Sequence, residues 1–148
     1  NLWYYININM GNLKNLEVEE RDMGYRSEVV LAVSKPMVPH FLTVLARHES
    51  VRQLVHDCDT FDENYDDGGM LMYWGGIKWY DSYPEIAAIE KFVEDCESEC
   101  VEGWAPEEEH DTEYDHFKFL RIGEETDDVE EKGGFAQGDI YVSRSVSF

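Results

Sequence analysis

The sequence predicts a single α+β domain in which a mixed or mostly antiparallel sheet carries two helices on one face. Hydrophobic residues make up 43% of the 148-residue chain and aromatic residues 14%, which indicates a packed core rather than an acidic disordered chain. Segments with alternating apolar residues are interleaved with segments that have apolar residues at helical spacing. The predicted order of elements is β-α-β-α-β-β, which is typical of an α+β layer.

The predicted elements begin with a strand and a helix. Residues 25–34 show the alternation of a strand. Pro36 and Pro39 mark the start of a helix, because proline fits the first helical turn. Apolar residues then recur at helical spacing as far as Cys58. A capping-box pattern at residues 50–53 predicts a break in this helix.

An acidic loop and an interrupted strand are predicted next. Residues 57–67 carry six carboxylates and are followed by a glycine pair, which indicates a loop. Residues 70–74 predict a strand that continues through residues 77–80. The glycines at positions 75 and 76, between these two stretches, predict a bulge or turn.

The second predicted helix has a clear start signal. Ser82 is placed as the cap, Pro84 lies in the first turn, and Glu85 follows three residues after the cap. The predicted buried stripe consists of Ile86, Ile89, Phe92 or Val93, Cys96 and, as an extension, Cys100.

The last part of the chain predicts loops and two strands. Residues 97–115 form an acidic loop, and residues 114–122 form a strand. Residues 123–131 predict a turn or a short helical piece, and residues 139–148 predict a final strand. We expect the last two strands to pair antiparallel.

Residues 1–22 are expected to be an upstream in-frame extension or, through residues 2–8, an extra strand. Met23 is a natural start, and residues 19–22 before it can be encoded by a purine-rich run that resembles a bacterial ribosome-binding site. The acidic α+β domain is therefore expected to comprise residues 23–148.

Charge is the strongest functional signal in the sequence. The 33 Asp and Glu residues outnumber the 12 Lys and Arg residues, and the formal net charge is −21. This charge repels nucleic acid and anionic membranes and attracts basic proteins. We therefore predict a basic protein partner and no direct nucleic-acid binding. No membrane association is predicted either, because the apolar runs are far shorter than the roughly 18 residues that a membrane-spanning helix needs.

The acidic residues concentrate in three blocks, residues 57–67, 94–115 and 124–131. The candidate partner-binding carboxylates are Asp57, Asp59, Asp62, Glu63, Asp66, Asp67, Glu97, Glu99, Glu102, Glu107, Glu108, Glu109, Asp111, Glu124, Glu125, Asp127 and Asp128. The alternative interpretation is a surface charged only for solubility.

An aromatic cluster is the second candidate interface. It consists of Trp74, Trp79, Tyr80 and Tyr83. Trp and Tyr are enriched at protein interfaces, but the same residues also serve core packing. Base stacking is not predicted, because Lys78 is the only cation in this stretch.

The sequence contains a loose zinc-like pattern and no catalytic motif. Cys96, Cys100, His110 and His116 are zinc-ligand types at finger-like spacing. Alternatively, both cysteines belong to the apolar stripe and His116 is a strand residue. Residues 57–67 fail the EF-hand pattern, and the nucleophile elbow and P-loop are absent. We therefore predict a non-enzymatic protein without a cofactor. The odd number of cysteines is typical of a reducing cytosol.

Several stretches of the chain resemble a family of small proteins encoded by tailed phages and prophages. The stretches are residues 23–29 (MGYRSEV), residues 77–92 (beginning IKWYDSYPEI), residues 119–131 (FLRIGEETDDVEE) and residues 141–146 (YVSRSV). The resemblance spans most of the chain from Met23 onward but does not include the loop at 97–115. The family has no settled activity, so the resemblance implies a context, the cytoplasm of a bacterial host, rather than a chemistry.

Charge and resemblance together predict a phage accessory protein. It would bind a basic surface of a host nucleic-acid-handling or defence protein, including as a DNA mimic. This step rests on analogy with small acidic phage proteins. Two alternatives stay open. One is a virion or assembly protein that packs through its aromatic cluster and an exposed strand edge. The other is a metal-binding protein or metal-dependent enzyme.

Overall fold

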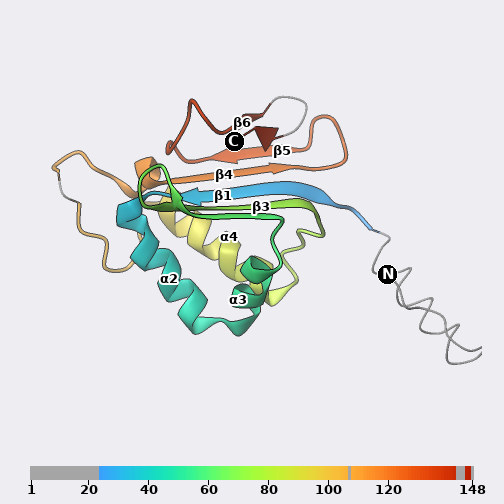
Figure 1. Cartoon of the computed structure of the whole chain (residues 1–148), viewed down its shortest axis with the longest axis horizontal. Coiled ribbons are helices and arrows are strands. Elements are labelled where there is room, and N and C mark those ends of the chain that lie inside the picture. Colours follow the sequence, from blue (N-terminus) through green and yellow to red (C-terminus); the bar gives the residue numbers. More distant parts are fainter. Residues whose placement is uncertain (1–23, 107, 143–145, 148) are drawn as a thin grey trace, which may run out of the picture.

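A five-stranded antiparallel sheet forms the centre of the molecule (Figure 1). The computed structural model describes residues 24–106, 108–142 and 146–147, so the predicted extension at residues 1–22 lies outside the described residues. The strands are β1 (Ser27–Val33), β2 (Thr60–Tyr65), β3 (Gly69–Ile77), β4 (Phe117–Ile122) and β5 (Val129–Lys132). Their order across the sheet is β2-β3-β1-β4-β5, and every pair is antiparallel. The predicted α+β class is confirmed.

Strand β1 lies at the centre of the sheet and is buried on both faces. Val29, Leu31 and Val33 belong to the main core, whereas Val30 and Ala32 belong to a second cluster. This division follows from the period of two in a strand, which sends successive side chains to opposite faces. Because β1 is covered on both faces, its residues from Val29 to Val33 are all apolar.

Three helices contribute to the main core: α2 (Val38–Arg47), α3 (Glu49–His56) and α4 (Pro84–Glu97). A short 3-10 helix, Lys35–Met37, precedes α2. The first predicted helix does break, but the break lies at His48, whose extended backbone (φ −132°, ψ 104°) separates α2 from α3. No side chain caps the start of α3 with a hydrogen bond, so the predicted capping box is wrong.

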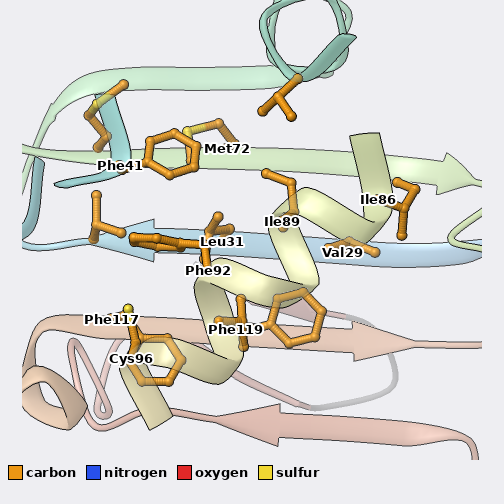
Figure 2. Close-up of a cluster of buried hydrophobic side chains, with 14 of the residues drawn as sticks. Val29, Leu31, Phe41, Met72, Ile86, Ile89, Phe92, Cys96, Phe117 and Phe119 are labelled. Atoms are coloured by element: carbon orange, nitrogen blue, oxygen red, sulfur yellow. The ribbon is translucent and has the colours of Figure 1, made fainter. Parts of the chain in front are cut away.

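Helix α4 crosses the sheet with its predicted apolar stripe buried (Figure 2). The buried residues of this helix are Ile86, Ile89, Phe92, Val93 and Cys96. The residue at the N-cap position is Tyr83 rather than Ser82. Cys100 lies beyond the end of the helix and is exposed, so it does not extend the stripe.

The C-terminal part of the chain covers the second cluster. Phe135 and Ile140 are buried there together with side chains from the central strands. The chain then forms two short paired strands, β6 (Tyr141–Val142) and β7 (Val146–Ser147). The prediction of one continuous strand over residues 139–148 is wrong for the described residues, which form two short strands. The predicted pairing with β4 is also wrong for them, because β5 pairs with β4 in that place. Residues 143–145 and 148 of that prediction lie outside the described residues.

Both edge strands lie in segments that the sequence predicts to be loops or turns. Strand β2 lies within the predicted acidic loop at 57–67, and β5 begins within the predicted turn at 123–131. The predicted order of elements is therefore wrong, because the main sheet and helices follow each other as β-α-α-β-β-α-β-β. Neither edge strand has a buried apolar face that would give an alternating pattern.

The predicted bulge in the second strand is confirmed. Ser27 lies opposite Ile77, whereas Val29 lies opposite Trp74, so β3 contains one residue more than β1 over this stretch. The extra residue falls at the glycine pair, as expected for a bulge. Strand β3 ends at Ile77, and residues 78–80 do not continue it.

Candidate protein-interaction surface

The first acidic block forms an exposed edge of the sheet, which we call the β2 edge (residues 57–67). Among the described strands, β2 pairs only with β3. The carboxylates of the β2 edge are Asp57, Asp59, Asp62, Glu63, Asp66 and Asp67, and all of them are exposed. None forms an ion pair with a described Lys, Arg or His. The β2 edge is therefore a negative surface that the described part of the chain does not neutralise.

Local hydrogen bonds hold some of these carboxylates in place. Asp59 Oδ2 accepts a hydrogen bond from the backbone N–H of Gly75 at 2.6 Å. Asp57 accepts hydrogen bonds from Gln53 Nε2 at 3.0 and 3.1 Å. Asp62 Oδ1 accepts one from the N–H two residues further along, at 2.9 Å. These hydrogen bonds partly fix the orientation of the carboxylates.

The third acidic block is largely used within the fold. The Arg121 guanidinium donates to Asp128 through Nη2 at 2.6 Å and Nη1 at 3.1 Å, and to Glu130 through Nε at 2.8 Å. Lys118, only 1% exposed, donates from Nζ to Glu131 at 2.7 Å. Two cations on β4 therefore neutralise the carboxylates beside them at the β5 edge.

Asp128 is the most constrained carboxylate of the third block. The Tyr25 hydroxyl donates to its Oδ2 at 2.6 Å. Hydrogen bonds from Arg121 and then from Tyr25 hold the pKa of Asp128 below its ordinary value. At the turn before β5, Glu124, Glu125 and Asp127 of this block are exposed.

The second acidic block is divided between the surface and the fold. Its exposed carboxylates include Glu97, Glu99, Glu102, Glu108 and Glu109, while Glu107 lies outside the described residues. Asp111 Oδ1 lies 2.5 Å from His116 Nε2, and His116 Nδ1 lies 2.6 Å from Ser34 Oγ. This chain of contacts ties the loop to the end of β1.

The first and third blocks lie at opposite edges of the sheet. Strands β3, β1 and β4 separate β2 from β5. Four strand spacings of about 4.8 Å place the two edges about 19 Å apart. The predicted acidic blocks therefore do not form one ridge along a single sheet edge.

The predicted aromatic interface lies mostly inside the protein. Trp74 and Trp79 are 3% and 8% exposed and belong to the main core. Tyr80 is half-buried, and its hydroxyl accepts a hydrogen bond from the backbone N–H of Tyr25 at 2.8 Å. Tyr83, at 38% exposed, is the member of the cluster that a partner can reach.

The zinc candidates do not converge. Among the described residues, no group of three His, Cys, Asp or Glu side chains is arranged to hold a metal ion. Cys96 is buried, and burial raises the pKa of its thiol, which disfavours the thiolate that zinc binds. Cys100 and His110 are exposed, and both ring nitrogens of His116 contact Asp111 and Ser34.

A pocket of about 430 Å³ opens at one end of the β2 edge. Asp57 and Asp59 line it together with Trp74, Tyr83 and Glu85. The lining comes from the end of α3, the bulge in β3 and the start of α4, which lie far apart in sequence. No local sequence pattern signals such a pocket, and the sequence does not predict it.

No helix in the described part of the chain is both long enough and apolar enough to cross a lipid bilayer. Comparisons with protein-family models, with curated proteins and with solved structures found no match to this chain.

Proposed function

We propose that this protein is a non-enzymatic binding protein that docks through its β2 edge on a basic surface of another protein. The observation that supports this most directly is the set of six exposed carboxylates at residues 57–67, which have no ion pair to a described cation. Like charges this close repel each other and destabilise the compact state. A basic partner relieves the repulsion on binding, whereas nucleic acid or an anionic membrane increases it.

The proposed partner is a host protein that handles nucleic acid or takes part in defence. Such proteins neutralise phosphates with Lys and Arg, and the same side chains accept carboxylates. The resemblance to tailed-phage proteins supports a bacterial host. In this proposal the β2 edge occupies a groove that otherwise holds nucleic acid.

The β2 edge is a better binding surface than the third acidic block. Asp128, Glu130 and Glu131 already bind Arg121 and Lys118. Recruiting them to a partner would break these ion pairs and leave a nearly buried Lys118 without its carboxylate. The carboxylates of the β2 edge lose no ion pair to a described residue when they meet a partner.

Two variants with equal charge change test this proposal. The β2-edge variant combines Asp62→Asn, Glu63→Gln, Asp66→Asn and Asp67→Asn. The control variant combines Glu99→Gln, Glu102→Gln, Glu108→Gln and Glu109→Gln in the second block. A partner captured from bacterial lysate with the unmodified protein is purified, and its affinity for all three proteins is measured by calorimetry at low and high salt.

The β2-edge variant should bind about tenfold more weakly at low salt, because rim charge pairs contribute up to about 1 kcal/mol each. The control should lose less than about threefold, and the affinity of the unmodified protein should fall as salt rises. Equal losses in the two variants, or an affinity that does not change with salt, would contradict the proposal.

A further inference from the structure

We propose that the pocket at the end of the β2 edge receives an arginine side chain of the basic partner. This inference rests on the proposed function and adds to it a specific anchoring site. The pocket, about 430 Å³ in volume, is continuous with the β2 edge, because Asp57 and Asp59 belong to both. An arginine bound there would fix the position of the partner while other basic residues lie along β2.

The pocket has an apolar floor that suits the methylene stem of a long side chain. Leu54, Trp74 and Ile86 supply this floor. Trp74 and Ile86 are buried in the main core, and Trp74 Nε1 donates a hydrogen bond to Leu54 O at 3.0 Å. This hydrogen bond joins Trp74 of β3 to Leu54 near the end of α3. The pocket is therefore formed before a ligand binds, which lowers the entropic cost of binding.

Three carboxylates from separate segments line the pocket together with these apolar residues. Asp57 lies at the C-terminal end of α3, Asp59 lies just before β2, and Glu85 lies in the first turn of α4. Asp59 is oriented by the N–H of Gly75 through one oxygen, Oδ2. A planar guanidinium carries five N–H donors and can bind more than one carboxylate at once.

Two cations, Arg26 and Lys78, also line the pocket, and neither is without an interaction partner. Arg26 Nη1 donates to the Gly76 carbonyl at 3.1 Å. The lining thus has three carboxylates against two cations, so its local charge is only slightly negative. The net charge of −21 on the whole chain decides the sign of the ligand, because it attracts cations to the pocket and repels anions.

The aromatic side chains favour arginine over lysine. Tyr83 lines the pocket and is 38% exposed, so its ring can be reached by a ligand. Guanidinium groups stack on aromatic faces and are less strongly hydrated than ammonium groups. Arginine should therefore bind here more tightly than lysine.

A titration followed by amide NMR tests the pocket without the partner. The probes are N-acetylarginine amide, the corresponding lysine amide, and the citrulline amide, which has nearly the same shape as arginine but no charge. The reporters are the backbone amides of Gly76 and Ile77, which line the pocket. The full chain is used throughout.

The arginine probe should shift the Gly76 and Ile77 amides in a saturable way, with an affinity at least about threefold higher than that of the lysine probe. Glu85→Gln should weaken arginine binding at least about threefold, while Glu63→Gln, a matched change elsewhere on the β2 edge, should leave it unchanged. Absence of saturation, equal binding of citrulline, tighter binding of lysine, or an unchanged affinity in Glu85→Gln would each overturn the proposal.

The result separates this inference from the proposed function. If a basic partner depends on the β2 edge but arginine does not shift the pocket amides, the arginine site is wrong and the docking surface stands. If arginine binds the pocket but the partner binds the β2-edge variant as tightly as the unmodified protein, the docking surface is wrong and the pocket stands as a separate arginine site.

Discussion

The two edges of the sheet are both acidic, but they use their carboxylates in different ways. At the β5 edge, Glu130 and Glu131 bind Arg121 and Lys118. At the β2 edge, the carboxylates form no ion pair with a described residue. The cause lies in the neighbouring strands, since β4 carries both cations and β3 contains no Lys or Arg.

This difference shows that an acidic segment is not by itself a binding surface. Cross-strand neighbours lie close enough for opposite charges to pair. An acidic strand beside a basic strand is therefore neutralised within the fold, as at β5. An acidic strand beside an apolar one, as at β2, keeps its negative electrostatic field. The charge also protects the exposed edge from pairing with other strands.

The largest change in the free energy of unfolding should come from removing Lys118, the buried cation that binds Glu131 of β5. Lys118→Ala leaves a cavity, and it removes the hydrogen bonds from Nζ to Glu131 and to the Gly133 carbonyl at 3.2 Å. The free energy of unfolding should fall by about 2–4 kcal/mol. Glu63→Ala, at the β2 edge, should change it by less than about 0.5 kcal/mol. Urea unfolding measures both.

Lys118→Met separates packing from polar contacts in the same experiment. Methionine retains most of the buried stem but cannot donate a hydrogen bond. It should recover part of the stability that alanine loses. Equal losses for Lys118→Ala and Glu63→Ala would remove the distinction between the two edges.

A smaller and pH-dependent effect is expected for Asp128→Asn. Arg121, followed by Tyr25, lowers the pKa of Asp128 from its ordinary value of 3.8. A carboxyl group with a lowered pKa stabilises the folded state above its unfolded pKa, and this contribution is lost as the pH falls through the folded pKa. The substitution should therefore cost about 1–2 kcal/mol at neutral pH and progressively less below pH 3.8.

Urea unfolding of this variant and the unmodified protein across the acidic range measures the pH effect. Asp127→Asn is the matched control, because Asp127 is exposed and forms no ion pair with a described residue. A loss for Asp128→Asn that is the same at neutral and acidic pH would show that the ion pair with Arg121 does not carry the effect.

The sequence predicts the central elements well because their signals are local. Strand β1 carries alternating apolar residues within an apolar segment at 29–33, and α4 has a proline start followed by a regular apolar stripe. The edge strand β2 has no such signal, since five of its six residues are exposed. Its extended conformation depends on pairing with β3, which is a tertiary contact.

The path of the C-terminal segment also depends on tertiary contacts. After β5, Gly133 has a φ of 90°, and a Cβ at this position would lie 2.1 Å from the Phe117 carbonyl oxygen. Glycine therefore permits the chain to turn closely past the start of β4. The alternation in residues 139–148 resembles a sheet strand, but the place beside β4 is already taken by β5.

The sequence predicts which residues of the candidate surface are acidic, but it does not predict which of them form ion pairs within the fold. The sequence identifies all three acidic blocks, yet it does not show that Arg121 and Lys118 lie across from the third block. The pocket beside the β2 edge could not be predicted from the sequence, because Leu54, Trp74 and Glu85 come together only in the folded chain.

Neutralising the β2 edge should change the free energy of unfolding least. It should raise this free energy, whereas Lys118→Ala and Asp128→Asn should lower it. The combined variant Asp62→Asn, Glu63→Gln, Asp66→Asn and Asp67→Asn removes repulsion without breaking an ion pair to a described residue. It should raise the free energy of unfolding by up to about 1 kcal/mol at low salt. The gain should shrink as salt screens the repulsion in the unmodified protein, since the Debye length falls to about 8 Å at physiological ionic strength. Urea unfolding at several salt concentrations measures this trend. A loss of stability at low salt would mean that these carboxylates are needed by the fold, and the contrast between β2 and β5 would then fail.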